Sequence, residues 1–450
     1  MASQSRFIGF VVATWAAALL ACGEAPPKVA SEPTVSAPRV ARTTSAAAVV
    51  APPSAEVKAP VAPVAPPAPA EPKSFLERES ALTRFFAALA ALEGDAGTRD
   101  VRVLQLGDSH TTPDWSTAVV RRKLTARFGD GGRGFVALGK PWKTYVQDGL
   151  KFGMSREWAP AHARLVKGRV VGDGFYGLTG VAIESSRPGG GAWLDAPFAE
   201  RVEIAYVAQP GGAPFDLLVD GSAVVRVATK ANAMGVQYRG LDVPPGAHHV
   251  EVRPAGPGRV RILGAALDQK TKGVSVDSLG RDGARAANLL QWNEGALSSL
   301  LTWRDPSLVI LAYGTNECGD KDVDDATYER ELAEVVGRVV RATKGASCLL
   351  LGPPDYSQAT FQGPIQHPRL ASIIATQRRV AAAADCAFYD QTAAMGGPGA
   401  MAAWAAEDPP RARKDGVHLT REGYTALAER FADDLLAAYA AQRARAAGTN

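Results

Sequence analysis

The 450-residue sequence predicts an α/β fold, in which a three-layer α/β/α domain with a parallel sheet is interrupted by an inserted all-β sandwich. Two observations predict this division. Before residue 140 and after residue 271, short apolar runs alternate with stretches of helical periodicity, as in strands joined by crossover helices. Between about Trp142 and Gln269, short alternating runs are instead separated by Gly, Pro and Asp-Gly turns, which is typical of a sandwich. We expect residues 74–140 and 271–450 to form one domain and residues 141–270 to form the insertion.

The individual elements follow from the periodicity of apolar residues. Ser74 is a plausible N-cap for the first helix, which we expect over residues 78–92. The strands expected in the parallel sheet are residues 101–106, 308–312, 348–351 and 386–389. The helices expected around it are residues 115–128, 284–301, 328–343, 368–384 and 421–446. Four strands of the insertion are expected at residues 201–207, 216–220, 248–253 and 259–263.

The N-terminus has the pattern of an export signal. Arg6 precedes an apolar run over residues 7–21 that is too short to span a membrane comfortably. The run ends in a Leu-Leu-Ala-Cys-Gly sequence that resembles a bacterial lipobox, with Cys22 as the residue that is lipidated; in an ordinary cleaved signal, Cys22 would be incidental. Because Gly and not Asp follows Cys22, the resemblance implies the outer membrane, facing the periplasm. Residues 22–73 are rich in Pro and Ala and are expected to form an extended linker.

Composition limits the classes of partner and cofactor. The formal charge of +4 is spread along the chain without a long basic run, so nucleic acid is not an expected partner. The six His and four Cys have no metal-ligand spacing, and we expect neither a metal nor another cofactor. Cys348 and Cys386 each open an apolar run in what we expect to be neighbouring strands. They could form a disulfide or remain two buried thiols.

Polar segments follow the strands expected in the parallel sheet, where such sheets bind ligands. Gly107–His110 follows the first strand and Tyr313–Glu317 follows another. Residues 352–355 follow a third strand, and residues 415–418 precede the last helix, where the chain must return to the same edge. Topology therefore brings together four segments that are far apart in the sequence.

These segments contain the groups needed for nucleophilic catalysis. Ser109 is the predicted nucleophile and His418 is the base that takes its proton. Asp415, three residues before His418, can accept a hydrogen bond from the other ring nitrogen. The Ser109 N–H, a glycine N–H and the Asn316 amide are the donors expected for an oxyanion.

The same residues resemble the marker blocks of the SGNH/GDSL hydrolase superfamily. Gly107–Ser109 resembles its first block, Gly314–Glu317 its third and Asp415–His418 its fifth. For the second block we choose Gly280 as the oxyanion donor, because it follows a predicted strand, with Gly283 as the alternative. The resemblance implies an SGNH-type α/β/α domain and a carboxylic ester hydrolase that works through an acyl-enzyme.

A narrower resemblance is to bacterial peptidoglycan O-acetylesterases with an inserted carbohydrate-binding module. It depends on His110, which follows the serine and is a possible pocket residue, and on the position of the β insertion. It implies that the substrate is an O-acetylated envelope polysaccharide, peptidoglycan first. The alternatives are a lipase or acylhydrolase, a polysaccharide O-acetyltransferase, and a non-catalytic glycan-binding lipoprotein. We expect Asp108, Glu317 and Asp355 to fasten loops and not to act as acids.

Overall fold

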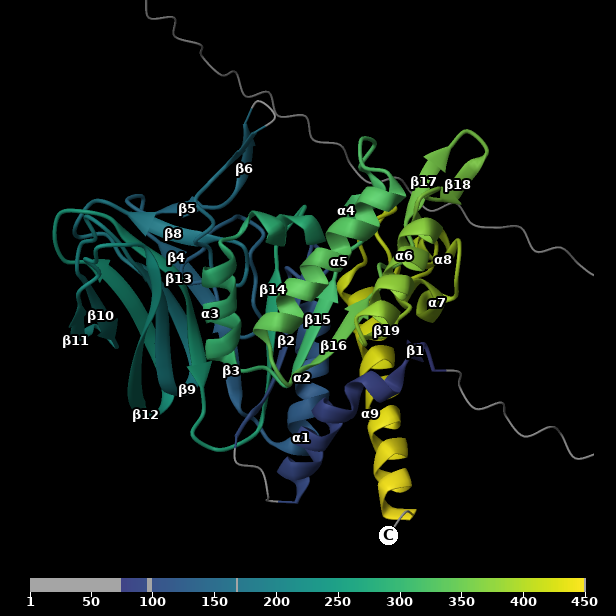
Figure 1. Ribbon diagram of the computed structural model, residues 1–450, viewed down its shortest axis with the longest axis horizontal. Helices are drawn as coiled ribbons and strands as arrows, with labels where there is room; N and C mark the ends of the chain where they lie inside the picture. Colours follow the sequence, from purple (N-terminus) through teal and green to yellow (C-terminus); the bar gives the residue numbers. More distant parts are fainter. Residues whose placement is uncertain (1–73, 95–98, 167–168, 449–450) are drawn as a thin grey trace, which may run out of the picture. The chain divides into compact units, whose positions relative to one another are not determined.

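A six-stranded sheet forms the centre of the α/β domain in the computed structural model, which describes residues 74–94, 99–166 and 169–448 (Figure 1). Across the sheet, the strands follow the order β1 (Leu76–Glu77), β19 (Ala387–Tyr389), β16 (Ser347–Leu351), β15 (Leu308–Ala312), β2 (Val101–Gly107) and β14 (Val274–Gly280). All neighbouring strands are parallel except the antiparallel edge strand β1. Starting from β14, the five parallel strands have the order 2-1-3-4-5 in the chain, which reverses between β2 and β15. A doubly wound sheet binds its ligand at such a reversal.

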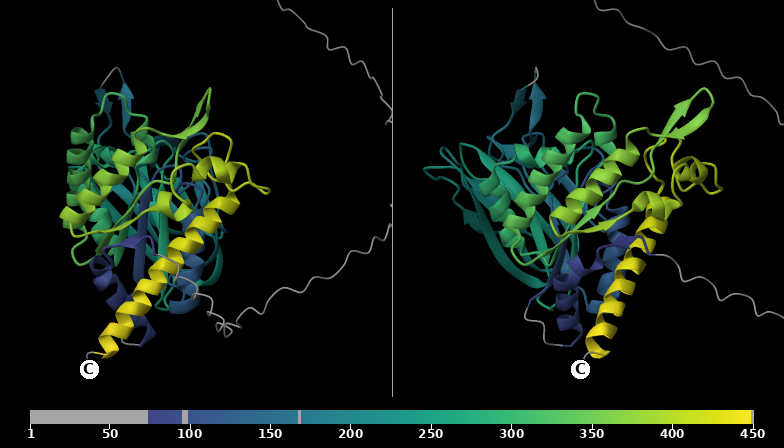
Figure 2. Two further views of the ribbon diagram at one scale, coloured as in Figure 1. Left: turned by 90° about the vertical axis from the view of Figure 1, so that its right-hand side faces the viewer. Right: turned by 45° about the vertical axis from the view of Figure 1, so that its right-hand side comes forward.

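Helices cover both faces of this sheet, so the three-layer prediction is confirmed. Leu104 and Leu106 pack with α3 (Glu294–Arg304), α5 (Asp325–Ala342) and α6 (Leu370–Ala383). Val101 and Val103 point to the opposite face and pack with α1 (Thr83–Glu93), α2 (Trp115–Phe128) and α9 (Arg421–Gly448). Figure 2 shows α9, in yellow, lying along this second layer. Because both faces are buried, the strands contain near-continuous apolar runs.

A β-rich region lies between α2 and β14, as the sequence predicts. Nine of its strands form one antiparallel sheet with a separate hydrophobic core. These strands are β3 (Gly132–Val136), β4 (Lys151–Met154), β5 (Ala159–Ala161), β8 (Ala182–Ser185), β9 (Ala192–Ala208), β10 (Phe215–Val219), β11 (Ser222–Val227), β12 (Gly235–Pro254) and β13 (Val260–Asp268). The sheet extends to residues before 141, because β3 pairs with β13. Two hairpins, β6 (Arg164–Val166) with β7 (Arg169–Val171) and β17 (Ser357–Thr360) with β18 (Gly363–Gln366), project from the same end of the molecule (Figure 1).

Two helix predictions were wrong in detail. The stretch 284–301 is not one helix: a 3-10 helix, η2 (Ala286–Gln291), precedes α3, whose N-cap Asn293 accepts a hydrogen bond from the Ala296 N–H. The first α-helix begins at Thr83 and not near residue 78, after the 3-10 helix η1 (Glu79–Leu82). Ser74 does not cap it: its hydroxyl accepts a hydrogen bond from the Leu76 N–H at the start of β1, and Arg78, with a left-handed backbone of φ 57°, precedes η1. Local side-chain hydrogen bonds and a positive φ are invisible to apolar periodicity.

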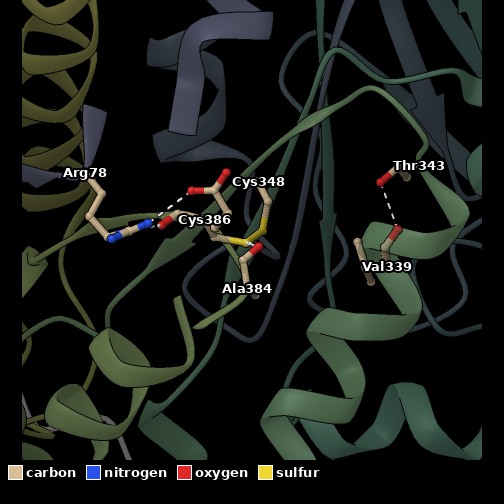
Figure 3. Close-up of a disulfide and its surroundings, with 7 residues drawn as sticks. Arg78, Val339, Thr343, Cys348, Ala384 and Cys386 are labelled. Carbon is tan, nitrogen blue, oxygen red and sulfur yellow. Dashed lines mark hydrogen bonds and ion pairs between the residues drawn. A yellow bond between two sulfur atoms is a disulfide. The ribbon is translucent and has the colours of Figure 1, made fainter. Parts of the chain in front are cut away.

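A disulfide joins Cys348 in β16 to Cys386, which directly precedes β19 (Figure 3). Of the two states that the sequence allowed for these cysteines, the structure has the disulfide. Arg78 lies beside it, donating hydrogen bonds to the Cys386 carbonyl at 3.2 Å and to the Asp385 carboxylate at 3.0 Å. The disulfide thus ties together two adjacent parallel strands near the edge of the sheet.

The predicted signal at residues 1–21, the lipidation site Cys22 and the linker to residue 73 lie outside the described residues. Within the described residues, no helix is both long and apolar enough to cross a membrane.

Candidate active site

The three strands at the reversal end level with one another. Gly107, the last residue of β2, pairs with Gly280 of β14 on one side and Ala312 of β15 on the other. A side chain at residue 107 would collide with Thr111, since a Cβ there would lie 2.3 Å from its Oγ1. Glycine is therefore needed for the chain to turn sharply after β2.

Ser109 lies in the turn that follows β2. The backbone carbonyl of Asp108 accepts hydrogen bonds from the N–H groups of Thr111 and Thr112, both at 3.1 Å. The side-chain carboxylate of Asp108 accepts one from the His110 N–H at 2.9 Å. Helix α2 begins only at Trp115, so Ser109 is not its N-cap and does not stand at a helix start. Asp108 fastens the turn, as predicted.

The side chains of Ser109, His418 and Asp415 form a hydrogen-bonded chain. Ser109 Oγ lies 3.0 Å from His418 Nε2, and His418 Nδ1 lies 2.9 Å from Asp415 Oδ2. The structure thus brings together three residues from segments about 300 positions apart, at the distances that proton transfer requires.

Asp415 is held as an anion by its own turn. Partial burial alone would raise its pKa, but hydrogen bonds from the N–H groups of His418 and Val417 lower the pKa below its ordinary value. Both of these N–H groups donate to Oδ1 at 2.9 Å, which leaves Oδ2 for the imidazole. A carboxylate fixed in this way selects the tautomer in which Nε2 is free to accept the serine proton.

Asn316 and Gly283 lie with Ser109 around the same cleft. The Asn316 amide follows β15 and donates a hydrogen bond to the Ala284 carbonyl at 3.0 Å. Its nitrogen also lies 3.5 Å from the Asp108 carboxylate, a long hydrogen bond that a bound oxyanion would replace. Gly283 has a positive φ of 68° and an open position where a Cβ would meet no atom. In the described part of the chain, the N–H groups of Ser109 and Gly283 have no acceptor. Three donors are thus available for an oxyanion.

Gly280, our first choice for the second donor, does not line the cleft. It is packed against the turn after β2, where a Cβ would lie 2.3 Å from the Thr112 nitrogen. Glycine at this position allows the turn to approach β14. The alternative, Gly283, is the residue that the structure places beside Ser109 and Asn316.

The cleft has a volume of about 540 Å³. His110 does not line it but lies buried behind the turn, where Nδ1 is 2.9 Å from the Tyr424 hydroxyl. Burial, together with the nearby charge of His418, lowers the pKa of His110 to about 3. His110 is therefore neutral and packs against the site without reaching the substrate.

The remaining acidic residues near the strand ends fasten loops, as predicted. Glu317 accepts hydrogen bonds from the N–H groups of Ala286 and Gly314. Asp355 accepts hydrogen bonds from the N–H groups of Gly399 and Met401. Among the described residues, no group of three or more His, Cys, Asp or Glu side chains could hold a metal ion.

Trp115, Arg413 and Tyr424 also line the cleft, and none of them was among the predicted site residues. Arg413 could have been noticed, because it stands two residues before Asp415. Trp115 and Tyr424 begin or lie within helices whose apolar periodicity explains them equally well as core residues.

Comparison with known proteins identifies part of the chain. Residues 246–426 match the model of the GDSL-like Lipase/Acylhydrolase family. The matched segment includes Asn316, Asp415 and His418 but not Ser109, which precedes the β-rich region. None of the curated proteins matches the chain.

The whole fold is similar to that of a solved peptidoglycan O-acetylesterase. The TM-score is 0.68 at 25% identity, over 82% of this chain and 100% of that chain. A family two carbohydrate esterase from Clostridium thermocellum has a TM-score of 0.27 at 12% identity, over 62% of this chain and 97% of that chain. An acetyl-xylooligosaccharide esterase from Geobacillus Stearmophilus has a TM-score of 0.29 at 18% identity, over 36% of this chain and 73% of that chain. These last two TM-scores are too low to carry an argument.

Proposed function

We propose that this chain, a carboxylic ester hydrolase with a GDSL-like lipase/acylhydrolase domain, removes O-acetyl groups from an envelope polysaccharide, peptidoglycan first. The observation that carries the proposal is the hydrogen-bonded chain of Ser109, His418 and Asp415 beside three oxyanion donors. It lies in a fold similar, over four fifths of the chain, to that of a peptidoglycan O-acetylesterase.

The proposed reaction has two steps. His418 Nε2 takes the proton of the Ser109 hydroxyl as Oγ bonds to the acetyl carbon, and the sugar oxygen then leaves with that proton. In the second step, His418 takes one proton from water, whose oxygen bonds to the acetyl carbon, and Ser109 leaves with that proton. The acetic acid released loses its remaining proton to solvent and becomes acetate. Asp415 stabilises the imidazolium in both steps.

The oxyanion of each tetrahedral intermediate needs donors that are already in place. The N–H groups of Ser109 and Gly283 and the Asn316 amide fill this role in our proposal. In other hydrolases, one such donor stabilises the transition state by about 3–4 kcal/mol. The Asn316 amide is held by the Ala284 carbonyl, so the amide group stays in place while its second N–H exchanges the long contact with Asp108 for the oxyanion.

The location that we propose is the bacterial outer membrane, facing the periplasm, with a lipid on Cys22. The pattern around Cys22 supports this proposal, as do the proline-rich residues 22–73, which would let the enzyme reach the wall. The Cys348–Cys386 disulfide is compatible with an oxidising compartment. If Cys22→Ser stayed in the membrane fraction to the same extent as the wild type, the anchor would be refuted.

Acetate release from O-acetylated peptidoglycan tests the proposed function. We expect Ser109→Ala to reduce release by at least about 1,000-fold, because the nucleophile is removed while binding remains. Ser80→Ala, at an exposed position of η1, is the matched control and should keep full activity. Equal acetate release by the wild type and Ser109→Ala would refute the proposal, and so would a wild type that cleaves 4-nitrophenyl acetate but releases no acetate from the polymer.

A further inference from the structure

Arg413 stands beside the catalytic base, in the wall of the cleft. Its backbone N–H donates to the His418 carbonyl at 2.8 Å, and its carbonyl accepts from the Gly416 N–H at 3.3 Å. The turn that positions Asp415 and His418 therefore also fixes Arg413. Among the described residues that line the cleft, Arg413 is the one arginine or lysine.

The Arg413 guanidinium has no carboxylate partner in the described part of the chain. Its neighbour Arg411, by contrast, is paired with Glu407. Arg413 lies instead over the Trp115 ring, with 5.9 Å between Cζ and the ring centroid. Stacking on an aromatic ring restricts the guanidinium while its N–H donors remain available.

The cleft also contains one carboxylate, that of Asp282. It follows the edge strand β14 and accepts a hydrogen bond from the Thr144 hydroxyl. Asp282 and Arg413 come from different segments of the chain, so the cleft has opposite charges supplied by separate loops. An anionic substrate would turn its charge toward Arg413 and away from Asp282.

We propose that Arg413 binds a carboxylate on the substrate, so that the preferred substrate is an O-acetylated acidic sugar. This inference rests on the proposed function and adds to it the class of sugar. The planar guanidinium matches a carboxylate with two parallel N–H···O bonds. Because Arg413 is adjacent to the turn of the base, the carboxylate it binds belongs to the same sugar unit as the ester or to the next one.

Two acetylated oligosaccharides of equal length, a neutral xylo-oligosaccharide and an acidic oligogalacturonide, provide the probes. The measured quantity is the ratio of kcat/KM for the acidic substrate to kcat/KM for the neutral one. We expect the wild type to prefer the acidic substrate by about tenfold or more, as one charge-assisted contact would give. Arg413→Gln should bring the ratio close to one, and Arg413→Lys should give an intermediate ratio, since its charge remains but the two-pronged geometry is lost.

Lys414→Gln is the matched control, because Lys414 is exposed, adjacent in sequence and outside the cleft lining. It removes the same charge and should leave the ratio within about twofold of the wild type. An unchanged ratio in Arg413→Gln would overturn the inference, as would a wild type without preference for the acidic substrate. These outcomes differ from failure of the proposed function, in which the wild type, assayed in parallel on O-acetylated peptidoglycan, releases no acetate from that polymer.

Discussion

Asp415 performs two tasks with its two oxygens. Oδ1 accepts from the backbone of Val417 and His418, and Oδ2 faces the imidazole. The base and its partner are therefore built within one four-residue turn. This local construction is why their spacing could be recognised in the sequence, whereas the partnership with Ser109 depends on the whole sheet.

Asp108 should make stability depend on pH in a direction opposite to that of an ion-paired carboxylate. Burial, reinforced by the charge of Glu317, raises its pKa to about 8, although the His110 N–H opposes the shift. In the unfolded chain the pKa is about 3.9. Between these values the folded state binds one proton more than the unfolded state, so the free energy of unfolding should fall as pH rises from about 4 to 8.

Asp108→Asn tests this dependence, because asparagine resembles the neutral acid and can still accept from the His110 N–H. We expect the melting temperature of the variant, relative to the wild type, to rise by about 2 °C or more between pH 5 and pH 9. Asp322→Asn, at an exposed loop position, should show no such trend. A constant difference between Asp108→Asn and the wild type across this range would contradict the prediction.

Gly280 is the last residue of β14 and Gly283 lies just beyond it, and sequence reasoning cannot distinguish the two. Gly280 and Gly283 are three positions apart, and both follow the same apolar run, so the sequence could not tell which one lines the cleft. The choice depends on the approach of the turn after β2, which is a tertiary contact. His110 was uncertain for the same reason: its direction is fixed by Tyr424, more than 300 residues later.

At the scale of elements, buried strands were predicted best. The expected strands 308–312 and 101–106 agree with β15 and β2 to within one residue. Strand β15, covered on both faces, is continuously apolar, and β2 is apolar except at Arg102 and Gln105. The break between η2 and α3 was missed, since η2 continues the apolar spacing of a helix. The bends of β9 and β12 were also missed, because their bulges are set by pairing with partner strands.

The disulfide between β16 and the start of β19 should contribute substantially to stability. It closes a loop with a sequence separation of 38 residues and thereby restricts the unfolded chain. We expect the double variant Cys348→Ala, Cys386→Ala to lower the free energy of unfolding by about 2–4 kcal/mol, as measured by urea denaturation. Both thiols must be replaced, because a single variant would leave a reactive buried cysteine.

A reducing agent provides the control for this prediction. It should destabilise the wild type toward the double variant and leave the double variant unchanged. Cys318, which is free and buried, is present in both proteins and cancels in the comparison. A loss of less than about 0.5 kcal/mol would show that the crosslink adds nothing beyond strand pairing.

At the scale of the molecule, the β-rich sheet and the parallel sheet are joined by a buried ion cluster. Arg304, at the end of α3, lies 3.0 Å from the Asp268 carboxylate of β13 and 3.3 Å from the Asp277 carboxylate of β14. All three side chains are almost fully buried. The cluster therefore links the last strand of the β-rich region with the edge strand that follows it, through a helix of the α/β domain.

Arg304→Ala should consequently destabilise both regions together. Removing the Arg304 cation leaves the carboxylates of Asp268 and Asp277 buried without their countercharge. Breaking a buried ion pair by removing one partner lowers stability by about 3–5 kcal/mol. We expect the free energy of unfolding, measured with urea, to fall by that amount. Unfolding should remain a single transition, whether it is followed by far-ultraviolet circular dichroism or by tryptophan fluorescence. Arg338→Ala, which removes a partly exposed i,i+4 pair with Glu334, should cost no more than about 0.5 kcal/mol. Two separate transitions in Arg304→Ala would contradict the expectation that both regions unfold together, and equally small losses in both variants would show that the buried cluster does not stabilise the protein.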